Sequence, residues 1–205
     1  MLITRRGLRM FSNYDLRANL ESRVVRLRNQ IESDRSILEP SYNESEYVPE
    51  MVKRNKVSPL ILHIDKITVS QAEANIPGRY FPSNYFVEPN QTYIKPIIVF
   101  HLPIEGATEL LQSRPSTHLL WSEEIAVENN RIIFELINFS NDAASLQKDR
   151  DQFLQNLQQQ ISYINKDVNA YNSSLETIIK ESVTKGREKL KIQEDILKKL
   201  GNLQK

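Results

Sequence analysis

The side chains best suited to acid–base or metal chemistry in this sequence are three histidines, His63, His101 and His118. His101 precedes Glu105 by four residues and His118 follows in the same predicted loop, so these three groups could form a catalytic or metal-binding cluster. The spacings H-x-x-H, H-x-E and H-E-x-x-H are absent, so a metal site would depend on contacts between distant parts of the chain. We expect no catalytic residue and no metal, with a hydrolase centred on His101, Glu105 and His118 as an alternative.

Other catalytic motifs are missing. The chain contains no cysteine and only 5 glycines, and neither G-x-G-x-x-G, G-x-x-x-x-G-K-S/T nor G-x-S-x-G occurs. The predicted hairpin near residue 129 carries several glutamates without a nearby lysine, which argues against a nuclease of the acid-acid-x-lysine type. We therefore expect no cofactor. The absence of cysteine fits a reducing compartment, and no apolar run reaches the roughly 18 residues of a membrane span, so a cytoplasmic protein without membrane contact is predicted.

Arginines near the N-terminus offer an alternative chemistry. Arg5, Arg6 and Arg9 precede the first predicted helix, and Arg17 begins a series of arginines on its outer face. Such residues can contact the phosphates of a nucleic acid. The formal net charge is only +1, however, so no global field draws the chain to a polyanion. A nucleic-acid-associated module is possible but not favoured.

The first 140 residues predict an N-terminal helix followed by a β module. Apolar residues recur every three or four positions from Leu16 to Ile31, and residues 39–50 are acidic and bounded by prolines, which is typical of a linker. Short β-type runs follow from residue 57, and Asn129-Asn130 suits the centre of a type I′ hairpin turn. We assign 1–56 to an arm, helix and acidic linker, and 57–140 to the β module.

Residues 141–205 predict a coiled-coil-like helical region. Apolar residues there occupy a narrow stripe at helical spacing, which cannot be buried without a partner surface. Ser173 and Glu176 form a capping box, which favours two helices, about 143–171 and 174–200, over a single helix. Toward the end of the stripe, Leu190, Ile196, Leu197 and Leu200 are candidate residues for binding another chain.

A loop between two predicted strands is a second candidate recognition site. Prolines and a glycine shape the loop, and it carries Glu105 and Arg114. These two residues could belong to a partner or ligand surface. Alternatively, Arg114 pairs with Glu105 or Glu109 and only fastens the loop.

Seven short segments stand out within residues 100–201: 100–106 (FHLPIEG), 109–111 (ELL), 114–117 (RPST), 167–169 (DVN), 172–175 (NSSL), 187–190 (REKL) and 200–201 (LG). Together they resemble an uncharacterised family of small bacterial proteins. That family combines a β module, which contains a strand, a His-x-Pro segment and an Arg-Pro-Ser-Thr loop, with two C-terminal helices. The resemblance covers about residues 95–201, and it implies a link to anti-phage defence gene neighbourhoods but no catalytic residues. After residue 117 this chain departs from the family, because HLLWSE replaces a turn with proline and glycine.

These observations lead to one fold prediction and one favoured function. The fold is α+β, with a mainly antiparallel sheet, an N-terminal helix and a long C-terminal helical pair. The function is that of a non-enzymatic accessory or scaffolding subunit in a bacterial anti-phage defence system. It would bind protein partners, or a second copy of itself, through the C-terminal helices.

Overall fold

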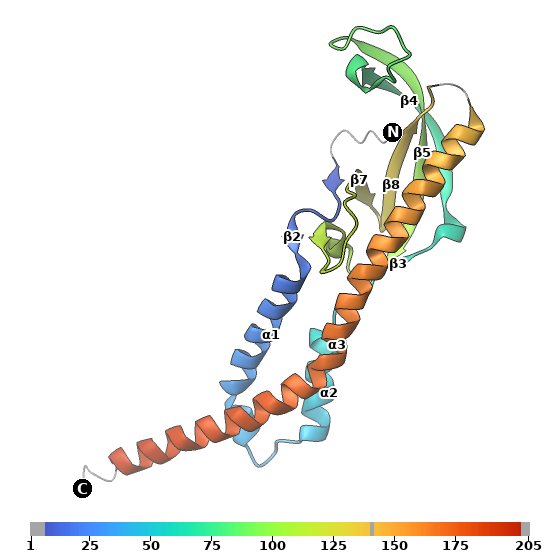
Figure 1. Ribbon diagram of the computed structural model, residues 1–205. Helices are drawn as coiled ribbons and strands as arrows, with labels where there is room; N and C mark the ends of the chain where they lie inside the picture. The colour runs from blue at the N-terminus through green and yellow to red at the C-terminus, as the bar shows by residue number, and fades with distance from the viewer. Residues whose placement is uncertain (1–6, 140–141, 202–205) are drawn as a thin grey trace. The chain divides into compact units, whose positions relative to one another are not determined.

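The fold was analysed in a computed structural model of the chain, which describes residues 7–139 and 142–201. Contacts divide the chain into two compact units. The first combines Met1–Asp15 with Pro59–Asn165, and the second combines Leu16–Ser58 with Lys166–Lys205. The chain is α+β, with an N-terminal helix and a long C-terminal helix, as predicted from sequence (Figure 1). No helix in the described part of the chain has the length and hydrophobicity needed to cross a membrane.

The first unit is built on a six-stranded sheet around β5 (Thr92–Glu105). Along one side β5 pairs with β4 (Thr68–Pro77) and, at its end, with β3 (Ile61–Leu62); along the other it pairs with β8 (Arg131–Ile137). β7 (Glu124–Glu128) and β1 (Leu8–Arg9) extend the sheet beyond β8. All of these pairings are antiparallel, which confirms the predicted sheet type.

Small elements complete this unit. β2 (Tyr14–Asp15) and β6 (Ser113–Arg114) form a separate parallel pair. Asn129 and Asn130, between β7 and β8, have φ angles of 50° and 57°, as the type I′ turn predicted from sequence requires. Short 3₁₀ helices occur at Ile64–Lys66, Gly78–Tyr80 and Thr108–Gln112.

Stacked aromatic rings join the sheet to the first part of α3 (Ala143–Gly201). Phe100 on β5 stacks on Phe134 on β8 with ring centroids 4.8 Å apart, and Phe134 stacks on Phe153 of α3 at 4.1 Å. Trp121 packs edge-on against Phe153. Burying such large rings is a main source of stability, so this stack forms the centre of the first core.

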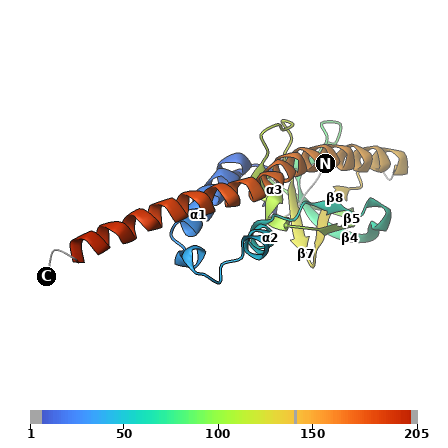
Figure 2. The same cartoon turned by 90° about the horizontal axis from the view of Figure 1, so that it is seen from below.

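The second unit is helical. It contains α1 (Leu16–Glu32), a 3₁₀ helix (Arg35–Leu38), α2 (Glu44–Asn55) and the later part of α3. In both views α1 and α2 lie on different sides of α3, and its last turns reach past both helices (Figures 1 and 2). Fully covered apolar side chains from α1 and α3, such as Ile31, Leu175 and Ile179, form its core.

α2 occupies much of the segment that was expected to be an acidic linker. Asn43 caps the helix, because its Oδ1 accepts a hydrogen bond from the Ser45 N–H at 3.1 Å. The Asn43 side-chain amide also donates to the Glu46 carboxylate at 2.9 Å, which ties the cap to the first turn of the helix. Two acidic residues of the segment, Glu44 and Glu46, thus lie in the first turn, where they interact favourably with the helix dipole.

The predicted helical pair at the C-terminus is wrong, because α3 is one continuous helix from Ala143 to Gly201. Ser173 does not cap a new helix. Its hydroxyl donates to the carbonyl of Asn169, one turn earlier, at 2.8 Å. The polar residue Asn172 has a different role here. Its side chain accepts a hydrogen bond from the N–H of Val57 at 3.0 Å and donates one to the C=O of Val57 at 2.8 Å.

The same two-point contact occurs twice more along α3. Asn165 holds the backbone N–H and C=O of Leu60 at 2.9 and 2.7 Å, and Gln160 holds those of Leu119 at 3.1 and 3.3 Å. We call these three contacts the amide clamps of α3. Val57, Leu60 and Leu119 lie outside regular helices and strands, so their backbone polar groups need side-chain partners once they are covered.

Candidate protein-interaction surface

The last turns of α3 expose a stripe of four large apolar side chains. Ile192, Ile196, Leu197 and Leu200 are 60%, 50%, 61% and 57% exposed. Because an α-helix has 3.6 residues per turn, residues 192, 196 and 200 follow one another along one face and residue 197 borders them. We call these four residues the terminal stripe.

Packing within the second unit stops just before this stripe. Leu190 is only 6% exposed, so it belongs to the core of its own unit and not to the exposed surface predicted from sequence. Slightly earlier, Arg187 donates from Nε to the Ile37 carbonyl at 3.0 Å, and its guanidinium lies over the Tyr42 ring at 4.3 Å. Every residue from 191 to 201 is exposed, so the described part of the unit does not cover the terminal stripe.

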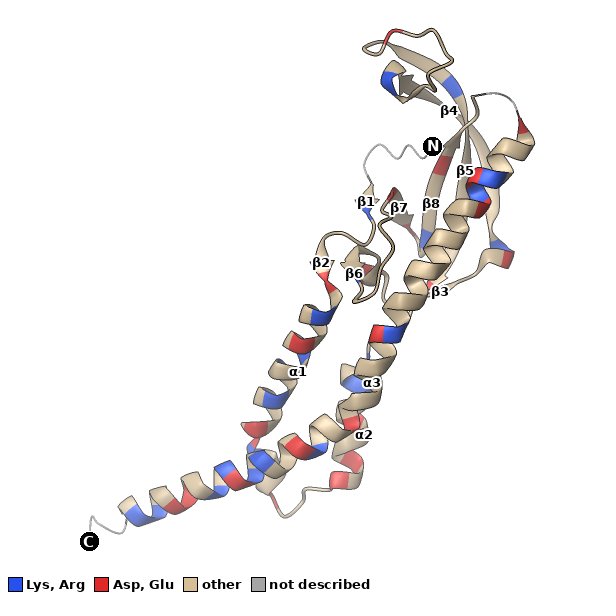
Figure 3. Cartoon of the chain, viewed as in Figure 1, with Lys and Arg blue, Asp and Glu red and all other residues tan. Residues whose placement is uncertain are grey.

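Charges of both signs surround the terminal stripe. Lys191, Glu194 and Asp195 lie along the last turns, and Lys198 and Lys199 end the helix, where the helix dipole favours cations (Figure 3). This mixture of signs keeps the helix end hydrated without giving it a strong field. The apolar side chains are therefore its distinctive feature as a surface.

The structure gives Glu105 and Arg114 different partners. Glu105 lies 2.9 Å from Nε2 of His63, and Arg114 lies 3.8 Å from Oδ2 of Asp15. The predicted pairing of Arg114 with Glu105 or Glu109 is replaced by this contact, because β2 and β6 run side by side and bring Asp15 opposite Arg114. The side chains of Glu105 and Arg114 are 66% and 51% exposed, so each remains accessible beyond its partner.

The arginines proposed to contact nucleic acid are engaged within the chain where they are described. Arg9 donates to Ser122 at 3.3 Å, and Arg17 pairs with Glu21 one turn later at 2.9 Å. Arg5 and Arg6 lie outside the described residues.

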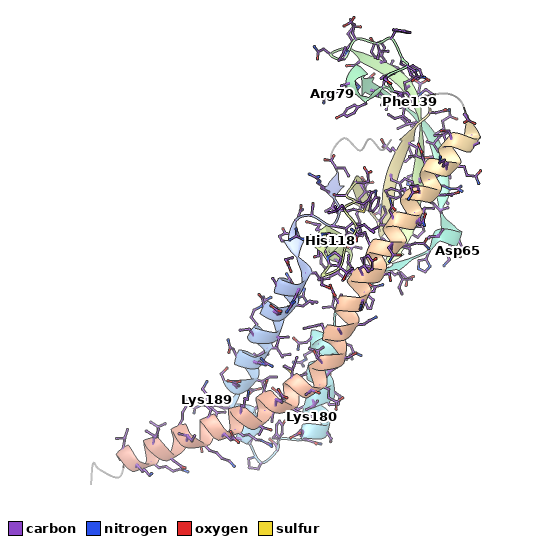
Figure 4. The ribbon with its side chains drawn as sticks, in the orientation of Figure 1. Asp65, Arg79, His118, Phe139, Lys180 and Lys189 are labelled. Carbon is purple, nitrogen blue, oxygen red and sulfur yellow. The ribbon has the colours of Figure 1, made fainter. Side chains whose placement is uncertain are left out.

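The three groups of the alternative hydrolase centre have separate surroundings. His101 lies 3.2 Å from the Ser70 hydroxyl on the neighbouring strand, whereas Glu105 contacts His63. His118 is exposed in the loop that follows β6 (Figure 4). Among the described residues, no group of three or more His, Cys, Asp or Glu is placed to hold a metal ion.

Two hollows were not predicted from the sequence. One of about 500 Å³ lies beside an aromatic cluster in which Phe81 packs edge-on against Tyr85, Tyr93 and Phe139; Arg79 and Phe139 line it (Figure 4). The other, of about 680 Å³, is a groove between α2 and α3. The aromatic residues of the first were visible in the sequence as anchors of an irregular segment. The second depends on α2, which the sequence analysis treated mostly as linker.

No protein-family model, no curated protein and no solved structure matches this chain. The candidate surfaces are therefore interpreted from their own physical chemistry.

Proposed function

We propose that this protein is a non-enzymatic accessory or scaffolding subunit that joins protein partners, or a second copy of itself, through the terminal stripe of α3. The observation that carries this proposal is the exposure of Ile192, Ile196, Leu197 and Leu200 on the last turns of one helix. Scattered exposed apolar residues are normal on protein surfaces, but a contiguous patch of them usually marks a contact.

The size of the terminal stripe suits a contact of modest strength. Burying a Leu or Ile side chain fully is worth about 1.5–3 kcal/mol, and roughly half of each side chain in the stripe is still available to a partner. Four such residues can therefore supply several kcal/mol before the entropic cost of association. This favours a reversible, assembly-dependent contact.

The proposed setting is a bacterial anti-phage defence system in the cytoplasm. The resemblance of residues 95–201 to a defence-associated family supports the first part. The lack of cysteine supports the second, since a protein of a reducing compartment has no use for disulfides.

Light scattering of the purified protein, alone and with proteins from its native host, tests the role of the terminal stripe. Replacing Ile196 and Leu200 with aspartate should abolish self-association or partner capture and leave the unfolding temperature within a few degrees. Gln193→Asp adds a negative charge on the same turns without removing an apolar side chain, so it serves as the matched control. Assembly that survives the double aspartate variant would remove the stripe from consideration.

Glu105 and Arg114 are proposed as a secondary contact on the first unit. Their exposure supports this role, although Glu105 also pairs with His63 and Arg114 with Asp15. Arg114→Ala should weaken partner binding while the melting temperature stays within a few degrees. A large loss of stability with normal binding would show that Arg114 has only a structural role, in its pairing with Asp15.

A further inference from the structure

The groove between α2 and α3 has an apolar floor that α2 provides. Val48, Pro49 and Val52 line it from α2, and Glu176 and Lys180 line it from α3. Figure 4 labels Lys180 on α3. Val48 is buried, whereas Pro49 is exposed and Val52 is half-buried. Pro49 also lacks an N–H group, so it cannot donate to the carbonyl of Ser45, which lines the same groove. The floor is thus open to an apolar occupant.

The rim of the groove carries uncompensated positive charge. Its two acidic residues already have partners, because Glu44 lies 3.7 Å from Arg187 and Glu176 lies 2.5 Å from Lys180. Lys53 and Lys56, by contrast, form no ion pair within the described part of the chain, and both are exposed. They lie at the end of α2, where the helix dipole also favours cations.

We propose that this groove docks an amphipathic helix of another protein whose apolar face is flanked by aspartate or glutamate. A helix laid in a groove inserts side chains spaced three and four residues apart, and about 680 Å³ can hold a few of them. Acidic residues beside that face would lie near Lys53 and Lys56, the two lysines of the groove that form no ion pair with any described residue. A basic or neutral helix would leave those charges uncompensated.

The same charge argument makes the C-terminal end of a second copy a poor match for the groove. Residues 181–201 carry six lysines and arginines against four acidic residues, so this helix end would bring further positive charge to Lys53 and Lys56. The groove and the terminal stripe also share no residue. The groove is therefore a second interaction surface, independent of the function proposed for the stripe.

The test is a selection against the full-length protein from a displayed library of helical peptides of about 16 residues, a length that sustains a helix. Leucines are fixed at positions 1, 5, 8 and 12, and the flanking positions vary among Glu, Gln and Lys. The enriched peptides should be rich in Glu. Their affinity should fall about tenfold for the double variant Lys53→Glu with Lys56→Glu, since the variant replaces two exposed attractive charge pairs with repulsive ones.

Two further variants make the result decisive. Val52→Asp should abolish binding, and because both lysines are exposed, the double charge reversal tests the same groove even if Val52→Asp unfolds the unit. Selection against the double variant should enrich Lys in place of Glu. The Ile196→Asp, Leu200→Asp variant should bind the peptides normally, which separates this site from the terminal stripe. Absence of binders, or binders indifferent to the sign of the flanking charge, would overturn the proposal.

Discussion

Two stretches of α3 have the same kind of sequence and opposite surroundings. Leu175 and Ile179 are fully buried, whereas Leu197 and Leu200, about six turns later, are more than half exposed. Both stretches place apolar residues at helical spacing among lysines and glutamates. Helical periodicity therefore identifies a face that could be buried. Whether that face is buried depends on whether other segments of the chain pack against it.

The packed stretch is also fitted to its neighbours in ways that the exposed stretch is not. Gly186 lies so close to α1 that an added Cβ would be 3.0 Å from the Glu32 Cα, and Asn172 and Arg187 bind backbone groups of neighbouring segments. Among the described residues, Gly201 has no such neighbour. The difference between the two stretches therefore involves polar and steric matching as well as apolar burial.

Truncating one leucine in each stretch should give the largest contrast. Leu175→Ala removes a fully buried side chain and should lower the free energy of unfolding by about 2–5 kcal/mol. Leu197→Ala should change it by less than about 0.5 kcal/mol, because its side chain is mostly exposed. Chemical denaturation of both variants measures the difference, and equal losses would mean that the helix end is covered.

Adding a side chain at each of the two glycines of α3, Gly186 and Gly201, should give the second-largest contrast in stability. Gly186→Val should destabilise the protein by up to about 3 kcal/mol, because the new atoms meet the backbone of α1 and the Ile37 side chain. A Cβ added at Gly201 would have no described atom within 4 Å, so Gly201→Val should be neutral. Thermal unfolding compares the pair; a neutral Gly186→Val would show that α1 does not approach α3 this closely.

The amide clamp at Asn172 should be worth about 2 kcal/mol, since Asn172→Ala leaves the N–H and C=O of Val57 without partners. Asn169→Ala is the matched control. Its side chain is exposed on the preceding turn, so the change should be neutral or slightly stabilising. Urea unfolding curves decide between a structural clamp and an incidental contact.

Ser173→Ala should produce the smallest effect, within about 0.5 kcal/mol and toward greater stability, because alanine is the better residue inside a helix. A true N-cap would instead lose about 1 kcal/mol on the same substitution. A measurable loss in thermal unfolding would therefore restore the break that the sequence suggested at this point.

Local signals predicted the parts of the fold that depend on neighbouring residues alone. The Asn129-Asn130 turn needs two residues that tolerate positive φ, and α1 shows regular apolar spacing from Leu16 onward. Both could be predicted because the conformation of these residues follows from local preferences and spacing and does not depend on distant contacts.

Features that depend on distant contacts were missed or misread. Asn172-Ser173-Ser174 has the composition of a helix start. Asn172 instead lies inside α3 and binds the backbone of Val57, which is more than one hundred residues away in the sequence. α2 was obscured by Pro49, which lies inside the helix. The groove on α2 could not be predicted without α2 itself, and the burial of Leu190 depends on which segments cover α3.

Because of the amide clamps, the exchange protection of three backbone N–H groups depends on side chains of α3. The N–H groups of Val57, Leu60 and Leu119 lie outside regular secondary structure, and each is bound to a side chain of α3. In hydrogen–deuterium exchange, each proton should stay protected only while its Asn or Gln remains in place, so its exchange rate measures how often that part of α3 detaches. Leu60 and Leu119 would follow this opening in the first unit, and Val57 would follow it in the second.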